Sequence, residues 1–355
     1  DLGVRIAMLV QFRLASIERI NCGARMVIRR FVMSRMLGHA AWLFALFGSA
    51  AASANPFVLY EPATDMALDH EDLDRYWHPA SLTKMMTAYV TLDAIKAGKL
   101  AAAQKLELSP YARSQPATRI GLRLGIDVTI EQGIRGLIMR SANDFAVALA
   151  EAVSGSEPEF VALMNATAKR LGMTRSHFKN PHGLPDPEQV TSARDMAVLA
   201  NALLRDFPDF ADVFSAQQMG IGKATLHTLN DLLRTLPGAD GMKTGFTCSS
   251  GYNIVASATR NGRRLIVVLL GEVSSLERSE RAAALINAAF EGKAIGNGDI
   301  APVKPQRLAD IPSPPMEAVP AEDLTRHTRT WKCGNPGGPA RPRVAQAAPK
   351  RKDKQ

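Results

Sequence analysis

A serine and a lysine stand three residues apart at the start of an apolar stretch, as Ser81 and Lys84 in the segment 78–90. Pro79 stops any earlier helix and good helix-forming residues follow, so the sequence predicts a helix that Ser81 opens. Residues three apart share one face of a helix, so the hydroxyl and the amine would be neighbours. A neutral lysine can take the proton of a serine hydroxyl, and burial near another cation lowers a lysine pKa. The pair therefore suits nucleophilic catalysis.

Ser-x-x-Lys by itself is a weak signal, because it occurs about once by chance in a chain of this length. A second copy, from Ser176 to Lys179, runs directly into Asn180-Pro181 and so ends in a loop. The alternative for Ser81 is an ordinary serine near a helix start. Other parts of the chain must decide between the two interpretations.

Two more polar sets follow along the chain. Ser141 and Asn143 lie in a polar break between two expected helices, where side chains can point into a cleft. Lys243-Thr244-Gly245 lies in a glycine-bounded strand candidate. Each set has a plainer alternative: a helix cap for Asn143, a loop position for Ser141, and a surface strand and turn for the third set.

The elements around these sets change in type along the chain. A hairpin is expected over residues 56–68. Helices are expected over residues 81–95, 130–138, 145–153, 159–171 and 193–204. Apolar runs at 252–258 and 265–270 flank Asn261-Gly262, a strong hairpin signal, and residues 277–290 predict a closing helix. Strands at both ends with helices between them indicate an α+β sandwich, an antiparallel sheet flanked by helices with an inserted helical subdomain.

The order and spacing of the three sets resemble a known signature. The spacings are 60 residues from Ser81 to Ser141 and 102 residues from there to Lys243. The active-site serine penicillin-recognising enzymes carry Ser-x-x-Lys, then Ser-x-Asn, then Lys-Thr-Gly in this order. The segment 80–87 and the turn His182-Gly183-Leu184-Pro185-Asp186 are similar, more specifically, to the low-molecular-mass D-alanyl-D-alanine carboxypeptidases.

The resemblance covers residues 55–290 and implies a β-lactamase/transpeptidase-like fold with a serine peptidase site and no cofactor. The substrate would be a peptidoglycan stem peptide ending in D-Ala-D-Ala, and β-lactams would be covalent inhibitors. Ser81 would attack the penultimate D-Ala carbonyl with Lys84 as base, and Ser141 would relay a proton to the leaving nitrogen. Water would then release the acyl-enzyme.

The resemblance also implies which residues hold the substrate. Asn143 would hold the peptide backbone, and Lys243 with Thr244 would face the terminal carboxylate, the lysine also helping to lower the pKa of the base. Gly245 would let the substrate lie close to the strand as an added β-strand. The backbone N–H of Phe246 would complete an oxyanion hole with that of the nucleophile. Phe246 replaces a histidine common in the family, which leaves this N–H intact and changes the pocket wall.

Two other functions stay open. A class A β-lactamase shares the three motifs but needs a glutamate for rapid deacylation. Residues 169–187 hold no glutamate; Asp186 is their one acid, and Glu188 lies just beyond. A non-catalytic wall-binding protein would keep the fold without the chemistry. Rapid nitrocefin turnover would support the first alternative, and failure of penicillin to label Ser81 would support the second.

The first 54 residues predict export. They carry seven arginines against two acids, an apolar run at 40–47 and an Ala-x-Ala-like site, after which cleavage would leave Asn55 first. We expect residues 1–54 to be a signal peptide. Alternatively, the earliest part of this segment is an upstream extension of the reading frame. The expected location is the periplasm or cell envelope.

The last part of the chain, residues 291–355, is rich in proline, alanine and basic residues and is expected to be a disordered tail. Residues 326–355 carry nine lysines and arginines against Asp353 alone, a net +8 of the chain's +9. We hypothesise that this tail contacts the anionic envelope electrostatically, with a functionless extension as the alternative. The body between the two ends is nearly neutral, which argues against a nucleic-acid partner.

The cysteines and histidines predict no separate site. No His-x-x-x-His or Glu-x-x-His occurs, so no metal is expected. Cys22 would leave with the signal segment. Cys248 is expected to pack at a strand edge rather than to act as a nucleophile, with a disulfide to Cys333 as the alternative. His182 is expected to be a turn residue.

Overall fold

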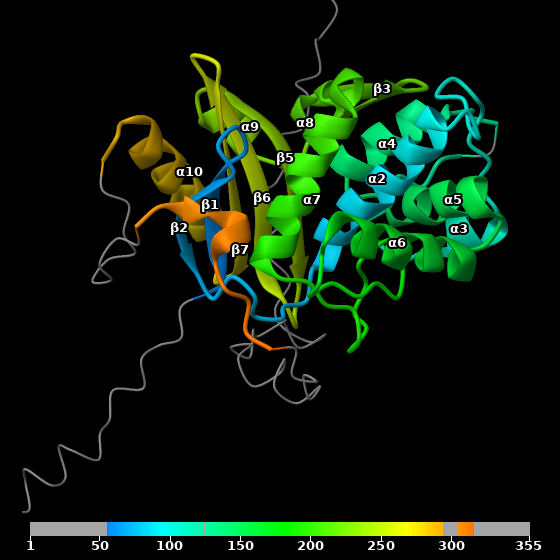
Figure 1. Ribbon diagram of the computed structural model, residues 1–355. Helices are drawn as coiled ribbons and strands as arrows, with labels where there is room; N and C mark the ends of the chain where they lie inside the picture. Colours follow the sequence, from blue (N-terminus) through cyan, green and yellow to red (C-terminus); the bar gives the residue numbers. More distant parts are fainter. Residues whose placement is uncertain (1–54, 124, 294–303, 316–355) are drawn as a thin grey trace, which may run out of the picture. The chain divides into compact units, whose positions relative to one another are not determined.

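The computed structural model describes residues 55–293, except 124, and residues 304–315 (Figure 1). The chain divides into a unit of residues 1–54 and a unit of residues 55–355, and every described residue belongs to the second. The predicted signal segment and the basic end of the tail, residues 316–355, lie outside the described residues.

A six-stranded antiparallel sheet runs through this unit in the order β5-β6-β7-β1-β2-β8. Its strands are β1 (Phe57–Glu61), β2 (Met66–Glu71), β5 (Ala239–Thr247), β6 (Gly251–Arg260), β7 (Arg263–Glu272) and β8 (Gln306–Arg307). The strand that carries the Lys-Thr-Gly set, β5, is the first in this order. Among the described residues it therefore has one side free for an added strand.

Helices make up most of the rest. They are the 3-10 turns η1 (Ala80–Leu82), η2 (Pro208–Phe210) and η3 (Leu308–Asp310), and the α-helices α2 (Thr83–Lys96), α3 (Pro110–Ser114), α4 (Ile130–Met139), α5 (Asn143–Ser154), α6 (Glu157–Leu171), α7 (Ala193–Asp206), α8 (Asp212–Ser215), α9 (Leu232–Thr235) and α10 (Ser275–Phe290). The sequence patterns do not foresee α3 or the separate hairpin of β3 (Gln218–Ile221) and β4 (Ala224–His227). No helix in the described part of the chain is long and apolar enough to cross a membrane.

Both faces of the sheet are buried. Side chains alternate along each central strand, so successive residues enter two different cores. In β7, Leu265 and Val267 join one core with α10, whereas Ile266 and Val268 join a larger core shared with the other helices. Helix α10 covers one face of the sheet and α7 packs on the other (Figure 1). The predicted sandwich with an inserted helical region is confirmed.

The β6–β7 hairpin turns at Asn261-Gly262, as predicted. Both residues have positive φ, 51° and 78°, which is the backbone that a two-residue hairpin turn requires. Arg260 pairs with Arg263 across the turn, so the register of the two longest strands is set locally.

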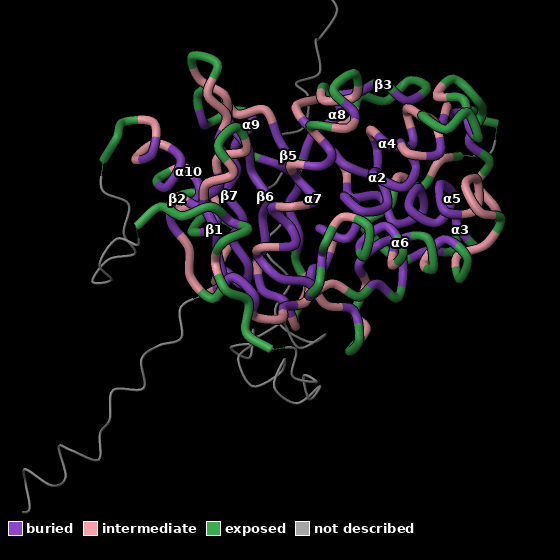
Figure 2. The backbone as a smooth tube through the Cα atoms, in the orientation of Figure 1, coloured by how far each residue is buried: buried purple, intermediate pink, exposed green. Residues whose placement is uncertain are grey.

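Helix α2 lies at the centre of the helical region. Its residues from Thr83 to Leu92 are all buried, and it packs against α4, α5, α6 and α7 (Figure 2). A helix that is buried on nearly all sides lies inside the protein rather than at its surface. The lysine at its first turn, Lys84, is therefore carried into the interior.

Part of the predicted disordered tail is ordered, which corrects that expectation for residues 304–315, called the strap below. Within it β8 pairs with β2, and the Leu308 side chain is buried. Arg194, ion-paired with Asp74 at 2.7 Å, donates hydrogen bonds to the carbonyls of Leu308 and Ile311. Composition does not reveal this, because one apolar anchor, Leu308, and one partly buried arginine, Arg194, decide the order here rather than the average of a proline-rich tail.

Candidate active site

Ser81 lies in the 3-10 turn η1 and Lys84 in the first turn of α2. The Lys84 ammonium nitrogen Nζ is 3.1 Å from Ser81 Oγ. Lys84 is completely buried, whereas Ser81 keeps partial exposure. A partly exposed hydroxyl thus lies next to an amine that water does not reach.

The second hydrogen bond of Lys84 Nζ goes to the backbone carbonyl of His182. The turn that presents this carbonyl is held by Asn180, whose Oδ1 accepts from the Gly183 N–H at 2.7 Å and from Gln189 Nε2 at 3.1 Å. Gln189 Oε1 accepts in return from the Asn180 N–H at 3.0 Å. His182 is therefore a turn residue, as predicted, but its carbonyl also orients the candidate base.

Gly183 sits where only a glycine fits. Its φ is +86°, and a Cβ added there would lie 1.9 Å from the Ala80 carbonyl oxygen. Ala80, next to the nucleophile, itself has a φ of 48°. The backbone of this turn therefore packs directly on the backbone that carries Ser81.

The segment before the nucleophile is attached to the sheet. Asn253 on β6 donates from Nδ2 to the carbonyls of His78 at 3.0 Å and Pro79 at 3.2 Å. Trp77 donates from its indole Nε1 to the Ser250 carbonyl at 2.8 Å. The donors and acceptors of these hydrogen bonds are mostly buried, so the bonds fix the position of η1 against β5 and β6.

Gly245 brings β5 against the backbone of Ser81. A Cβ added at this residue would lie 3.2 Å from the backbone nitrogens of Ser81 and Leu82. The sequence interpretation assigned the missing side chain to close approach of the substrate, but here it allows close approach of the strand to η1. The Phe246 ring is 42% exposed and packs on the Tyr252 ring, with centroids 4.2 Å apart.

Ser141 and Asn143 occupy the break between α4 and α5. Ser141 is buried with a φ of 57°, and its carbonyl accepts from Thr118 Oγ1 at 2.8 Å. Asn143 donates from Nδ2 to the Pro116 carbonyl at 2.9 Å. The N-cap of α5 is Ala142 without a side-chain bond, so the helix-cap alternative for Asn143 is wrong. The Lys84 ammonium bonds to Ser81 and His182 rather than to Ser141.

Asp144 is a site residue that the sequence reasoning missed. Its buried carboxylate accepts from the N–H groups of Ile120 at 3.1 Å and Gly121 at 2.9 Å. Its charge acts on Lys84 by favouring the protonated amine. Asp144 therefore ties the loop before α4 to the Ser141 break and partly balances the buried positive charge.

Burial is the main cause of the low pKa of Lys84, which lies well below its ordinary value, and the charge of Lys243 lowers it further. Burial also lowers the pKa of Lys243 to about 7, with the charge of Arg278 adding to the effect. Lys243 Nζ donates to the Thr244 carbonyl at 2.7 Å. The site is thus a buried cluster of cations in which a neutral amine at Lys84 is favoured.

Arg278 on α10 is a second residue that the sequence reasoning missed. It is 5% exposed, burial lowers its pKa, and in the described part of the chain its Nε has no hydrogen-bond partner. A buried guanidinium beside Lys243 calls for an anion. One feature of the sequence could have pointed to Arg278: it lies in the first turn of a predicted helix, where the helix dipole disfavours a cation.

The second Ser-x-x-Lys copy forms no such pair. Ser176 Oγ donates to the carboxylate of Asp195 at 2.7 Å, and Lys179 points to Glu188 at 2.6 Å in an exposed ion pair. Cys248 is exposed and disulfide-bonded, so the expectation of a packing residue at a strand edge is wrong. No group of side chains in the described part of the chain could hold a metal ion.

The sheet is covered on both faces, the helical region is inserted into it, and the serine–lysine pair stands at the start of α2. This is the arrangement of the penicillin-recognising serine proteins, and the β-lactamase/transpeptidase-like fold is confirmed. A family model of D-alanyl-D-alanine carboxypeptidases matches residues 47–274, and this chain belongs to that family.

Individual relatives show the extent of the similarity. D-alanyl-D-alanine carboxypeptidase DacA of Haemophilus influenzae is 40% identical over 225 residues, which cover 62% of this chain and 57% of the relative. The structure of penicillin binding protein 5 from Haemophilus influenzae matches with a TM-score of 0.63 and 36% identity, over 69% of this chain and 75% of that one. Penicillin-Binding Protein D2 from Listeria monocytogenes, in its cefotaxime-bound form, has a TM-score of 0.61 and 29% identity, over 67% and 97%.

The depressed pKa of Lys243 predicts how stability depends on pH. Between about 7 and its ordinary value of 10.5, the unfolded chain binds more protons at this lysine than the folded chain does. The free energy of unfolding should therefore rise with pH in this window, by up to about 1.4 kcal/mol per pH unit. Denaturant titrations at several pH values should show a smaller slope for Lys243→Met. The exposed-lysine variant Lys99→Met should keep the wild-type slope; equal slopes in all three proteins would contradict the prediction.

Proposed function

We propose that this chain is a serine-type D-Ala-D-Ala carboxypeptidase, which removes the terminal D-Ala from peptidoglycan stem pentapeptides through an acyl-enzyme on Ser81. The observation that carries the proposal is the completely buried Lys84 amine, 3.1 Å from the Ser81 hydroxyl, with a pKa lowered by burial and by Lys243. Membership of the family supports the choice of substrate. The chain spans only 57% of the length of the DacA relative, so the activity rests on the site rather than on the whole relative.

The reaction begins when Lys84 takes the proton of Ser81 and Oγ attacks the penultimate D-Ala carbonyl. The N–H groups of Ser81 and Phe246 hold the oxyanion, since Gly245 keeps the two backbones in contact. The leaving nitrogen receives a proton through the Ser141 hydroxyl, which both donates and accepts. Terminal D-Ala departs, and water then hydrolyses the ester.

The two ends of the reacting dipeptide need different partners. Lys243 and Arg278 provide buried positive charge for the terminal carboxylate, with Thr244 beside them. When the carboxylate binds, it should raise the pKa of Lys243 and keep that lysine charged. Asn143 uses one amide hydrogen on Pro116 and keeps the rest of its amide for the substrate backbone.

A further observation supports the proposal that β-lactams are covalent inhibitors of this protein. The Listeria monocytogenes relative is described in a cefotaxime-bound form, which fits β-lactams as covalent inhibitors here. Glu188, the acid nearest to the position a class A β-lactamase would need, forms an exposed pair with Lys179. That arrangement favours slow deacylation, because no buried carboxylate in this turn is aimed at an attacking water.

Ser81→Ala should abolish both D-Ala release from a D-Ala-D-Ala pentapeptide and labelling by a fluorescent penicillin, because the acyl-enzyme forms on this oxygen. Ser176→Ala is the matched control from the second Ser-x-x-Lys and should keep both activities. Persistent labelling of Ser81→Ala would refute the assignment. Rapid multiple turnover of nitrocefin by the wild-type protein would instead favour a β-lactamase, and absence of any labelling a wall-binding protein.

Lys243→Ala should lower kcat/KM for the pentapeptide by removing a charge-assisted partner of the terminal carboxylate, an effect of about tenfold or more. The same substitution should matter much less for a substrate whose terminal carboxylate is amidated. Comparing D-Ala and D-alaninamide release measures this difference. Equal losses on both substrates would show that Lys243 acts through Lys84 alone.

Export to the periplasm or envelope, and contact of the tail with an anionic surface, belong to the same proposal. The net charge of +8 in residues 326–355 supports electrostatic tethering, at up to about 1 kcal/mol per basic residue near an anionic membrane.

A protein ending at Pro315 should keep the strap and full D-Ala release, while losing the salt-sensitive binding to anionic liposomes that the chain ending at Gln355 shows. Co-sedimentation with liposomes at low and high salt measures the binding. Neutral liposomes are the control. Equal binding of the two proteins at low salt would mean that the tail does not tether the enzyme.

A further inference from the structure

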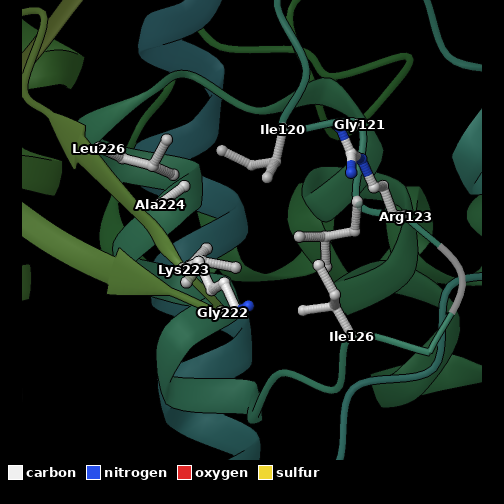
Figure 3. A pocket seen from close by; sticks show the side chains of 10 residues that line it. Ile120, Gly121, Arg123, Ile126, Gly222, Lys223, Ala224 and Leu226 are labelled. Atoms are coloured by element: carbon white, nitrogen blue, oxygen red, sulfur yellow. The ribbon is translucent and has the colours of Figure 1, made fainter. Parts of the chain in front are cut away.

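Two hollows of the described surface differ in character. One, of about 620 Å³, lies between the loop before α4 and the β3–β4 hairpin and has largely aliphatic walls (Figure 3). The other, of about 650 Å³, has two carboxylates in its wall, those of Glu151 and Glu157, beside the Tyr111 ring and the exposed Lys179. Glu157 also contacts His182, which belongs to the turn that orients the candidate base.

The His182 ring is buried, and its surroundings identify which nitrogen carries the proton. Burial and the charge of Lys84 lower the pKa of His182 to about 3, so the ring is neutral near pH 7. Its Nδ1 accepts a hydrogen bond from the Leu184 N–H at 3.2 Å, which assigns the ring proton to Nε2. The ring therefore has an N–H group to donate on the side away from its own turn.

The Glu157 carboxylate is the charged group next to this N–H, with Oε1 4.0 Å from Nε2. The separation is longer than a hydrogen bond, so the interaction is an attraction between the carboxylate charge and the ring dipole. The other oxygen of Glu157, Oε2, accepts from the Tyr111 hydroxyl at 2.9 Å. Burial raises the pKa of Glu157, and the bond from Tyr111 opposes this shift. The carboxylate thus lies fixed between a hydroxyl from α3 and the imidazole of the turn.

The position of the His182 backbone decides where the base lies, because its carbonyl accepts a hydrogen bond from Lys84 Nζ. One residue earlier, the Pro181 carbonyl accepts from Thr87 Oγ1 on α2 at 2.6 Å. The turn is thus bonded to α2 through two successive carbonyls, and the ring contact with Glu157 links it to α6. Efficient proton transfer requires the amine and the hydroxyl to stay within about 0.5 Å of the productive geometry. A loosened ring would therefore loosen the base.

We propose that Glu157 is a positioning residue of the reaction, which holds the His182 ring so that the His182 carbonyl keeps the Lys84 amine beside the nucleophile. This inference rests on the proposed function and extends the site beyond its three motifs. Because Glu157 acts on the base and not on the groups that hold the substrate, its loss should slow acylation and leave affinity unchanged. The alternative is a helix-dipole role, since Glu157 and Glu159 are both acids in the first turn of α6.

The test measures the rate of penicillin labelling against penicillin concentration, which gives a limiting acylation rate and an apparent affinity separately. Glu157→Gln keeps the shape of the side chain and an acceptor for Tyr111 but removes the charge. It should lower the limiting rate about tenfold at unchanged apparent affinity. His182→Asn retains a side-chain oxygen that can accept from the Leu184 N–H but lacks Nε2, and it should show the same loss. The double variant should lose no more than either single one, because both substitutions remove one interaction.

Two further variants separate positioning from folding and from the helix dipole. Tyr111→Phe changes only the hydroxyl of an exposed ring and should give a smaller loss of the same kind, about threefold in the limiting rate. Glu159→Gln is the matched control on α6 and should acylate at the wild-type rate.

The positioning role is wrong if Glu157→Gln keeps the wild-type limiting rate, if it loses affinity instead, or if Glu159→Gln loses as much. Additive losses in the double variant would also overturn it. In each of these cases, labelling of the wild-type protein at Ser81 still upholds the proposed function. A wild-type protein that is neither labelled at Ser81 nor able to release D-Ala would remove the proposed function, and this inference with it.

Discussion

The contact between Lys84 Nζ and Ser81 Oγ is the interaction on which the rest of the site depends. In the proposed reaction the amine must be neutral, and complete burial of Lys84 with the charge of Lys243 acting on it favours that form. Both lysines are costly to bury. The carbonyls of His182 and Thr244 accept hydrogen bonds from them, and the Asp144 charge offsets part of the repulsion.

Strain concentrates at the same place. Ala80 and Ser141 both have positive φ without being glycine, a conformation that costs on the order of 1 kcal/mol or more and persists only where surroundings enforce it. The enforcing contacts are visible: Gly183 packs on the Ala80 carbonyl, and Thr118 binds the Ser141 carbonyl. The sheet is buried on both faces, and this burial supplies stability that offsets the strain at the site.

The candidate site lies where the sheet meets the helical region. The sheet contributes the edge strand β5, and the helical region contributes α2 and the break between α4 and α5. The side-chain amide of Asn253 joins the two by binding the backbone just before the nucleophile. Under the proposed function, a substrate lying along β5 reaches the buried cations of Lys243 and Arg278 at one end.

The sequence by itself determined the elements with strong local signals: the helix behind Ser81, the Asn261-Gly262 hairpin, the helical middle and the order of the three motifs. Only the tertiary structure decided which distant groups meet them. The His182 carbonyl meets Lys84 from 98 residues away, and Asn253 meets the His78 carbonyl from 175 residues away. Arg278 likewise reaches the site from a separate helix, and no periodicity records such contacts. Periodicity and turn chemistry act over a few residues, whereas burial and pKa values depend on what the whole chain places nearby.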